Sequence, residues 1–574
     1  MRAERSISQI LFGYLPQQTV DLYKNVWKVK NWREPKNESS IDISTVKNAL
    51  KRAATPWRLT NNDGGYCMDL ERGFPLKVLL LDRENGVYVE PFPQTWMCRK
   101  CKRIHRNADS RCQCGYSGKL GQLPFVGYHP ECGAIVSPWI PQCKEHKQVR
   151  VILPGTSSAS EIKFECPICE KLIRKGFGFI ECQCGKGKLS FNVHRAASVY
   201  TPRSVVVVNP PSLEKIKMLR SAGGAAKALH WVINGMKEDS VAEVKSTKSS
   251  LRSQLREQGL EESVIDAMIK AAESQQKFDD ESLELNLPKE ILEDAETDAV
   301  SIALACYDSR CTVDKLKDDY KDNNKLKSLY EKNYPLALKM AGLDSVELID
   351  KFPVLTGAYG YTRGKQEPGE SRLVPFKNKK GEYNIYADIV ETEALLFKLD
   401  PIKILKWLKL FNSNLNEHDT PREARVEILK NTRFPKPGEN IGEINTGVIL
   451  LKLIHSFAHK VIRLSAVYSG IDQNALSELL VPSHLGFFVY AVGRGDFVLG
   501  GLQALFESEL DNLLNDLVNG EHRCPLDPGC RKSGGACMAC LHIGEPSCRY
   551  FNQYLSRDVL AYEKGYFSFI SAQN

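Results

Sequence analysis

The sequence predicts a multidomain α+β protein, and three features of the chain lead to that prediction. Close pairs of cysteines recur at regular spacing between residues 98 and 184. After residue 213 the apolar residues recur with the period of a helix instead of that of a strand. A last group of five cysteines lies between residues 524 and 548. The chain of 574 residues is long enough for about three or four domains.

We therefore divide the chain into four regions. Residues 1–92 are expected to form an N-terminal α/β region, and residues 93–203 a series of small repeated β modules. Residues 204–440 are expected to form a helical middle region that contains a charged arm at about 237–300. Residues 441–574 are expected to form an α/β domain around the last cysteine cluster.

Two apolar runs in the N-terminal region have the character of strands: VLLLD at residues 78–82 and VYVEPF at residues 87–92. Glu84, Asn85 and Gly86 lie between them and are typical of a turn. The sequence therefore predicts a β-hairpin that leads directly into the first cysteine pair.

The first and last cysteine groups of the repeated block share one design: C-x2-C-x10-C-x-C and C-x2-C-x12-C-x-C. Such close pairs suit a tetrahedral zinc ion, because each tight turn presents two donors and the loop brings the pairs together. We therefore predict zinc-ribbon-like modules instead of disulfides or free thiols. The predicted ligands are Cys98, Cys101, Cys112 and Cys114 in the first group, and Cys166, Cys169, Cys182 and Cys184 in the last.

A third group lies between these two and has the pattern H-x2-C-x10-C-x2-H. We interpret it as a degenerate copy of the same design, although histidines also serve as ordinary polar residues. Its predicted zinc ligands are His129, Cys132, Cys143 and His146.

Positive charge is concentrated on these modules. The whole chain has a formal net charge of +8, whereas residues 98–203 contain 18 Lys and Arg against 7 Asp and Glu. A basic block built on zinc modules favours contact with a phosphate backbone, although a solvated surface has a similar composition. The residues that we expect to contact DNA are Arg99, Lys100, Lys102, Arg103, Arg174 and Lys175.

The middle region begins with a buried strand, SVVVVNPP at residues 204–211, and then changes to a helical period that Gly223 and Gly224 weaken. Residues 237–300 are highly charged, and we expect an exposed helical arm that holds a partner or forms a solvated amphipathic hairpin. Residues 312–440 are expected to continue in helices and loops.

Two smaller features of the middle region have open interpretations. Cys306 and Cys311 have no second pair nearby, so we interpret them as unliganded thiols. Residues 359–383 interleave aromatic with basic side chains. Such a loop can follow a single nucleic-acid strand by stacking and charge, or it is a plain surface loop.

A long apolar-faced helix opens the C-terminal region, and Gly470 is expected to end it. His455 and His459 lie four residues apart on one face of this helix, which is the geometry of paired metal ligands. Ser456, however, occupies the place of the glutamate in a zinc-protease motif. We therefore interpret the two histidines as packing or hydrogen-bonding residues.

The last cysteine cluster predicts a further zinc site, because five cysteines lie within 25 residues. Four ligands suffice for one ion. We predict the four ligands Cys530, Cys537, Cys540 and Cys548, with Cys524 as the competing first ligand. The total expected is three or four zinc ions.

Several classes of function lack their motifs in this sequence. There is no phosphate-binding G-x-x-x-x-G-K-[ST] loop. Zinc held by four cysteines has no open position for water, so it cannot act as a Lewis acid. No apolar stretch of about eighteen residues and no secretion signal occur, so we expect a cytoplasmic protein. In such a reducing compartment, clustered cysteines favour metal over disulfides.

Seven stretches, in order along nearly the whole chain, resemble one known family. They are RSISQILFG, EPFPQTWMCRKC, HPECGAIVSPWIPQCKEH, RAASVYTPRSVVVVNPP, LIHSFAHKVI, GRGDFVLGGLQAL and CPLDPGCRKSGGACMACLHIGEPSCRYFNQYLSRDVL. With these motifs the chain resembles DrmB, the zinc-rich helicase partner of the DISARM antiphage defence system. Its C-terminal part is similar to the cysteine-cluster domain of MrfA-type DNA repair helicases. It departs from the family pattern at Tyr14 and Met538.

The resemblance implies a noncatalytic subunit without an ATP site, which forms a heterodimer with a DrmA-like helicase and helps it engage DNA. It further implies a bacterial antiviral defence operon, in the manner of a restriction system. A methyltransferase and a phospholipase-D-like nuclease are further candidate partners in that operon. The residues themselves agree with this picture, since they predict a basic zinc platform and a charged arm.

Two other functions stay open. A zinc-dependent hydrolase or nuclease requires an open metal site, and only the His129/Cys132/Cys143/His146 group or the His455 and His459 pair can supply one. The other alternative is a purely structural scaffold that binds proteins alone, in a related Druantia-type defence system.

Overall fold

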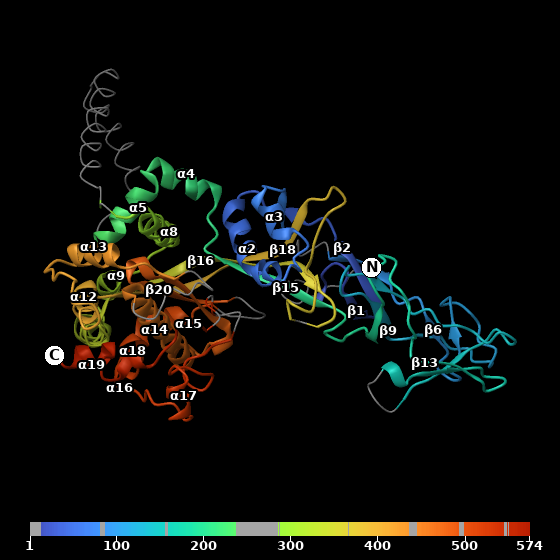
Figure 1. Cartoon of the computed structure of the whole chain (residues 1–574). Coiled ribbons are helices and arrows are strands. Elements are labelled where there is room, and N and C mark those ends of the chain that lie inside the picture. Colours follow the sequence, from blue (N-terminus) through green and yellow to red (C-terminus); the bar gives the residue numbers. More distant parts are fainter. Residues whose placement is uncertain are drawn as a thin grey trace, which may run out of the picture. The chain divides into compact units, whose positions relative to one another are not determined.

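The chain folds into two compact units, which we call the N-terminal unit and the C-terminal unit (Figure 1). The N-terminal unit contains Met1–Pro210 and Leu355–Ile389, and the C-terminal unit contains Pro211–Val354 and Val390–Asn574. This computed structural model describes residues 13–80, 86–154, 159–236, 285, 287–365, 367–435, 445–492, 499–544, 548, 550 and 552–573.

One antiparallel sheet of the N-terminal unit consists of β1 (Thr19–Leu22), β2 (Asn25–Trp32) and β5 (Val87–Pro91). The other strand of the predicted hairpin, β4 (Leu76–Leu80), does not pair with β5. It lies instead between the short β3 (Lys36–Asn37) and the first part of β18. The two strands are therefore confirmed, but the hairpin is wrong, because each strand finds its neighbour in a distant segment. The expected turn at Glu84 and Asn85 lies outside the described residues.

Helix α2 (Ile43–Leu59) covers β15 (Thr201–Val208), the buried strand that the sequence predicts. The Asp42 carboxylate accepts hydrogen bonds from the first free backbone N–H groups of α2 and so caps the helix. Val46 and Leu50 recur at helical spacing and pack in one cluster with residues of β15. Helix α3 (Tyr66–Glu71) follows and joins the same core.

The predicted β modules are present as three small antiparallel sheets of three strands each. Phe164 and Phe177 form part of the apolar cluster within this region. Besides these sheets, the described residues of this region form one short helix, η1 (Ala159–Glu161). The strands of the three sheets are β6 (Trp96–Met97), β7 (Ile104–His105) and β8 (Gly121–Gln122); β9 (Phe125–Tyr128), β10 (Ile135–Val136) and β14 (Ser190–Val193); and β11 (Arg150–Ile152), β12 (Lys163–Glu165) and β13 (Leu172–Lys175).

The expectation that residues 312–440 continue in helices and loops is wrong in part, because two long strands lie among them: β16 (Leu343–Thr362) and β18 (Tyr383–Leu399). Their sequences are rich in β-branched and aromatic residues, which suit a pleated surface. Both strands contribute residues to each of the two units. The short β17 (Val374–Pro375) pairs with the end of β16.

Other parts of the middle region are helical as predicted. Helices α4 (Leu213–Ser221) and α5 (Gly224–Ile233) are separated at Gly223, whose φ of +114° suits glycine. Of the predicted charged arm, residues 237–284 and 286 lie outside the described residues, and its end forms α8 (Lys289–Ala305). No helix in the described parts of the chain is both long and apolar enough to cross a membrane.

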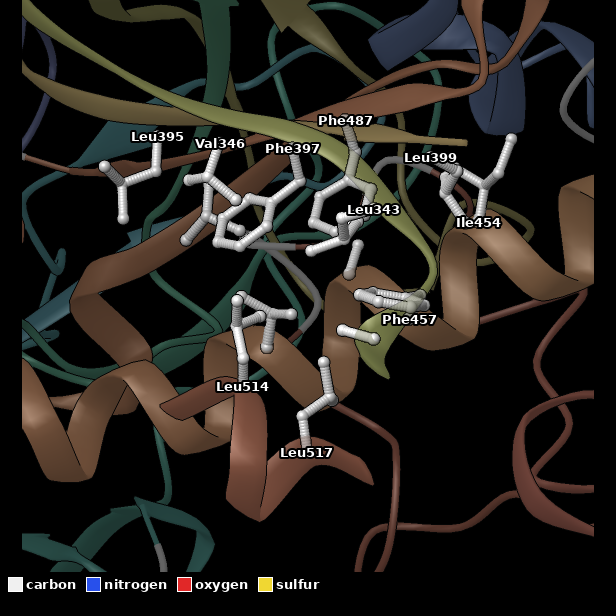
Figure 2. Packing of buried hydrophobic residues seen from close by; sticks show 14 of the residues in the cluster. Leu343, Val346, Leu395, Phe397, Leu399, Ile454, Phe457, Phe487, Leu514 and Leu517 are labelled. Carbon is white, nitrogen blue, oxygen red and sulfur yellow. The ribbon is translucent and has the colours of Figure 1, made fainter. Parts of the chain in front are cut away.

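The core of the C-terminal unit is built around α14 (Thr446–Ser469), which ends at Gly470 with a left-handed backbone, as predicted. The strand β20 (Gly486–Ala491) pairs with the second part of β18 and with β19 (Leu476–Val481). Figure 2 shows Phe457 of α14 and Phe487 of β20 within one apolar cluster. Helix α14 of this core also carries His455 and His459, the two histidines that the sequence places on one helix face.

Many shorter helices surround this core. They are α9 (Val313–Asp319), α10 (Asn324–Ser328), η2 (Leu329–Asn333), α11 (Tyr334–Ala341), α12 (Pro401–Leu408), α13 (Pro421–Asn431), η3 (Gln473–Ala475), η4 (Pro482–His484), α15 (Gly501–Ala504), η5 (Leu505–Glu509), α16 (Leu510–Asn519), α17 (Gly529–Lys532), α18 (Asp558–Ala561) and α19 (Tyr566–Ser571).

Candidate metal centres

The first predicted ligand group comes together as expected. Cys98, Cys101, Cys112 and Cys114 place their sulfur atoms within 4.8 Å of one another. The Sγ atoms of Cys98 and Cys114 lie 3.6 Å apart, and those of Cys101 and Cys112 lie 3.4 Å apart. All four cysteines are free thiols. Their positions are therefore compatible with one shared metal ion.

One turn geometry recurs at four ligand pairs of the N-terminal unit. The N–H of the first ligand donates to the carbonyl oxygen five residues later, and its own carbonyl accepts from the N–H four residues later. The fourth residue after the ligand has a positive φ in each case. The four first ligands are Cys98, His129, Cys143 and Cys166. The repeated design that the sequence indicates is thus a repeated backbone turn.

The predicted grouping of the other two N-terminal sets is wrong. The structure brings His129 and Cys132 together with Cys182 and Cys184. Cys143 and His146 meet Cys166 and Cys169 in another group. Each predicted close pair is therefore present in the structure. Of these four pairs, however, the first and the last along the chain form one group, and the two middle pairs form the other.

Antiparallel strand pairing explains this interleaving. The His129 turn follows the end of β9, and the Cys182 turn precedes the start of β14. Tyr128 of β9 lies opposite Ser190 of β14, so these two turns meet at one end of the strand pair. In the same way, the Cys143 turn precedes β11 and the Cys166 turn follows β12, which are also antiparallel. The spacing of the ligands along the sequence does not show which strands pair.

Both mixed groups consist of three cysteines and one histidine. The Nδ1 atom of His129 lies 3.2 Å from Sγ of Cys132 and 3.5 Å from Sγ of Cys184. In the other group, Nδ1 of His146 lies 3.6 Å from Sγ of Cys143 and 3.5 Å from Sγ of Cys166. In each group the histidine ring therefore faces the sulfur atoms through the same nitrogen.

These separations fit a tetrahedral ion. Ligands bound to zinc at about 2.0 Å for nitrogen and about 2.3 Å for sulfur lie about 3.5 Å apart for a nitrogen–sulfur pair and about 3.8 Å apart for two sulfurs. The observed values, from 3.2 to 3.6 Å, lie close to this range. The donor sets therefore fit a zinc-like ion.

The local electrostatics favour the thiolate form at particular ligands. The backbone hydrogen bond from Tyr116 lowers the pKa of Cys114 to about 6. A backbone hydrogen bond from His146 similarly lowers the pKa of Cys143 to about 6. Burial, by contrast, raises the pKa of Cys101 to about 12. Because the thiolate is the metal-binding form, the lowered pKa values of Cys114 and Cys143 favour metal binding at neutral pH.

The C-terminal cluster contains Cys524, Cys530, Cys537 and Cys540. The Sγ atoms of Cys524 and Cys537 lie 3.5 Å apart, and those of Cys530 and Cys540 lie 3.7 Å apart. Cys524, the competing ligand, therefore belongs to this cluster. The prediction that Cys548 is its fourth ligand is wrong.

Cys548 lies instead beside His455, His459 and Glu478 in a fifth group of ligand-type side chains. The interpretation of the histidines as packing residues did not include this arrangement. Glu478 was missed altogether. One signal in the sequence was available, since Glu478 is the one charged residue in the otherwise apolar LSELLV strand.

A family model described as a domain of unknown function (DUF8724) matches residues 6–203. This segment contains the three ligand groups of the N-terminal unit and ends before the C-terminal ones. No curated protein matches the chain.

The side chains expected to contact DNA differ in their availability. Arg99, Lys100, Lys102 and Lys175 are exposed, whereas Arg103 is only partly exposed. The guanidinium group of Arg174 donates to the carbonyl oxygen of Phe177 at 3.0 Å and lies 5.7 Å from the ring centroid of Trp139. Arg174 is therefore already engaged within the protein.

The residues 359–383 do not form one exposed basic loop. Tyr359 and Tyr361 are buried in β16, and Arg363 is fully buried. The Arg363 guanidinium donates to the carbonyl oxygens of Gly133 and Gln17. This part of the segment is thus structural. Cys306 and Cys311 belong to none of the metal-ligand groups formed by the described residues.

Proposed function

We propose that the protein is a noncatalytic zinc-binding subunit that contacts DNA through its N-terminal unit and helps a partner helicase to engage it. The observation that carries this proposal is the first cysteine turn, where Arg99, Lys100 and Lys102 are exposed beside a four-cysteine group. A metal held there would fix three cations on a short, rigid turn. Such a turn is suited to contact neighbouring phosphates.

Zinc is the ion that best suits the donor sets. The four cysteine-rich groups offer only thiol sulfur and imidazole nitrogen. Calcium and magnesium prefer oxygen, whereas zinc is bound readily by thiolate and imidazole. Each group supplies four protein ligands, which is the number in closed structural zinc sites. This supports a structural role for the metal and a noncatalytic subunit.

Exposed aromatic rings next to basic groups also support contact with nucleic acid. Phe179 is 89% exposed, and Nζ of Lys188 lies 4.7 Å from its ring centroid. Trp139 is 57% exposed beside Arg174. Bases of single-stranded DNA stack on such rings, and this stacking is tolerant of sequence.

The partner and the biological setting rest on the resemblance to DrmB. On that basis we propose a heterodimer with a DrmA-like helicase in a DISARM-like antiphage system in the cytoplasm. Co-purification of the two chains from cells that express both would test the heterodimer. Two chains that elute separately at micromolar concentration would contradict it.

A charge-removal variant tests the DNA contact. Arg99→Ser, Lys100→Ser and Lys102→Asn together remove three cations, and asparagine tolerates the positive φ of +60° at position 102. We expect DNA affinity to fall by at least about tenfold. We also expect the slope of log binding constant against log salt concentration to become shallower by about 2 to 3, because fewer counterions are released. Fluorescence anisotropy over a salt series measures both.

The matched control removes three exposed lysines of the C-terminal unit: Lys321, Lys325 and Lys327, each to serine. This control should bind DNA like the wild type. An equal loss in both triple variants would show only an effect of net charge and would contradict a specific contact. Metal-dependent DNA cleavage by the purified wild-type chain would favour the hydrolase alternative.

A further inference from the structure

Four ligand-type side chains meet in the core of the C-terminal unit. His455 and His459 lie one turn apart on α14, and Glu478 lies in the middle of β19. Cys548 comes from the segment that follows the four-cysteine cluster. The ligand atoms of the four residues lie within 4.8 Å of one another. The two histidines and Glu478 are 0% exposed, and Cys548 is 3% exposed.

The polar atoms at this position are poorly satisfied by the protein alone. Neither carboxylate oxygen of Glu478 has a hydrogen-bond partner among the described residues, and the same holds for Nε2 of His459 and Nδ1 of His455. A buried carboxylate without donors destabilises the folded state unless a cation compensates it. The buried carboxylate therefore needs a compensating positive charge beside it.

The distances match those of ligands around one ion. Nε2 of His455 lies 3.0 Å from Oε1 of Glu478 and 3.2 Å from Sγ of Cys548. Nε2 of His459 lies 3.4 Å from the same carboxylate oxygen. Tetrahedral ligands of zinc are separated by about 3.3 Å for nitrogen and oxygen and by about 3.5 Å for nitrogen and sulfur. The three observed distances differ from these values by about 0.3 Å or less.

Neighbouring backbone groups orient two of the ligands. Nδ1 of His459 lies 2.8 Å from the carbonyl oxygen of Leu541, so this nitrogen carries the proton and donates it. The Nε2 atom of a neutral His459 therefore presents its lone pair to the centre, as metal-binding histidines do. The N–H of Asn552 donates to Sγ of Cys548 at 3.2 Å, which holds the sulfur atom in position.

We infer that His455, His459, Glu478 and Cys548 bind a fifth metal ion, and that this ion is zinc. A divalent cation balances one carboxylate and one thiolate, and two neutral imidazoles leave the site without net charge. That balance suits a site from which water is excluded. The mixture of imidazole, thiolate and carboxylate ligands is typical of zinc and unlike that of calcium or magnesium.

The ion has a structural role in this inference. Four protein ligands close the coordination shell, so no position is left for water or substrate. The site joins α14, β19 and the segment after the cysteine cluster. Leu541, whose carbonyl oxygen accepts the hydrogen bond from His459, directly follows Cys540 of that cluster. The fifth ion thus connects the four-cysteine cluster to the core helix.

The competing explanation is a metal-free cluster in which a protonated His455 pairs with Glu478. Elemental analysis of the purified full-length chain, combined with a crystal structure measured at the zinc absorption edge, distinguishes the two. We expect five zinc ions per chain and an anomalous peak between the two Nε2 atoms, the Glu478 carboxylate and Cys548 Sγ. Four peaks at the cysteine-rich groups, with none at this position, would overturn the inference.

Two variants provide a second measurement. Glu478→Gln keeps the side-chain shape but removes the charge, and Cys548→Ala removes the sulfur; each should reduce the content from five zinc ions to four. The controls His484→Gln and Cys306→Ala alter buried residues of the same unit outside the site and should retain five. A Glu478→Gln protein with five ions would contradict the inference. If a variant does not fold, the anomalous map of the wild type decides.

This site does not depend on the proposed function. A protein that fails to bind DNA but contains the fifth ion would contradict the DNA contact alone. A protein that binds DNA with four ions would contradict the fifth site alone.

Discussion

Arg557 is a buried residue that supports the C-terminal cysteine cluster without binding metal itself. Its guanidinium forms an ion pair with Asp527 at 2.7 Å and donates to the carbonyl oxygen of Gly535 at 3.1 Å. Asp527 in turn accepts from the N–H of Cys524 at 3.0 Å. Arg557 thus holds the loop that presents the cysteines.

We predict that Arg557→Lys weakens zinc retention by the cysteine cluster by about 10- to 100-fold, because loss of such supporting contacts loosens the ligand geometry. Competition with a colorimetric chelator measures the effect. Arg425→Lys serves as control, since Arg425 is a buried arginine of the same unit that pairs with Asp344. Equal zinc retention in wild type and Arg557→Lys would contradict the role of Arg557.

A second residue-scale feature is the buried ion network of the C-terminal unit. The carboxylate of Glu347 accepts from Arg310 at 2.6 Å and lies 2.8 Å from Nζ of Lys398. Burial alone would raise the pKa of Glu347, but Lys398 and Arg310 outweigh it and lower the pKa to about 2. The carboxylate is therefore ionised in the folded protein at neutral pH.

We predict that Glu347→Gln lowers the free energy of unfolding by about 3 kcal/mol, because it leaves the buried Lys398 without its counter-charge. The folded-state pKa lies below the ordinary value, so this stabilisation is fully present above about pH 4.5 and is lost only as the pH falls toward 2. Urea unfolding should therefore show the same loss at pH 5 and pH 7. Glu417→Gln, which affects an exposed pair with Lys409, should be nearly neutral. A loss that differs between pH 5 and pH 7 would contradict this reading.

At the scale of elements, the sequence predicts the cysteine turns well but not their partners. Ligand pairs such as Cys98 and Cys101 are recognisable because two donors in one turn are a local property. The partner of a turn depends on strand pairing between separate segments, 50 residues apart for Cys132 and Cys182 and 20 residues apart for His146 and Cys166. For the same reason the two strands of the predicted hairpin were recognisable, while their pairing was not.

Metal counting on paired variants tests the interleaving. Cys132→Ala and Cys184→Ala lie in one group, so the double variant should lose one zinc ion, as each single variant does. Cys169→Ala and Cys184→Ala lie in different groups, so this pair should lose two. Mass spectrometry of the metal content gives the counts. A loss of one ion from the second pair would restore the sequential grouping and contradict the structure.

For the molecule as a whole, the sequence predicts a multidomain α+β protein with metal-ligand groups in the N-terminal half and near the C-terminus. The structure contains both helices and strands, and its ligand-type side chains gather in those two parts of the chain. The long strands β16 and β18 and the ligand Glu478 were not foreseen. A residue such as Glu478 becomes a candidate ligand only when the fold places it beside residues from α14 and from the segment around Cys548. Composition and spacing show only which residues are neighbours along the sequence. A site in the core, by contrast, brings together residues that are far apart in the sequence.

We propose that basic turns of the N-terminal unit, held in place by metal, bind DNA. The decisive test measures the DNA affinity of the full-length protein under three conditions. These are before metal removal, after treatment with a strong chelator, and after return of zinc. We expect affinity to fall at least about tenfold on metal removal and to recover with zinc, because the cations would lose their fixed arrangement. Equal affinity of the zinc-loaded and the metal-free protein would contradict the claim.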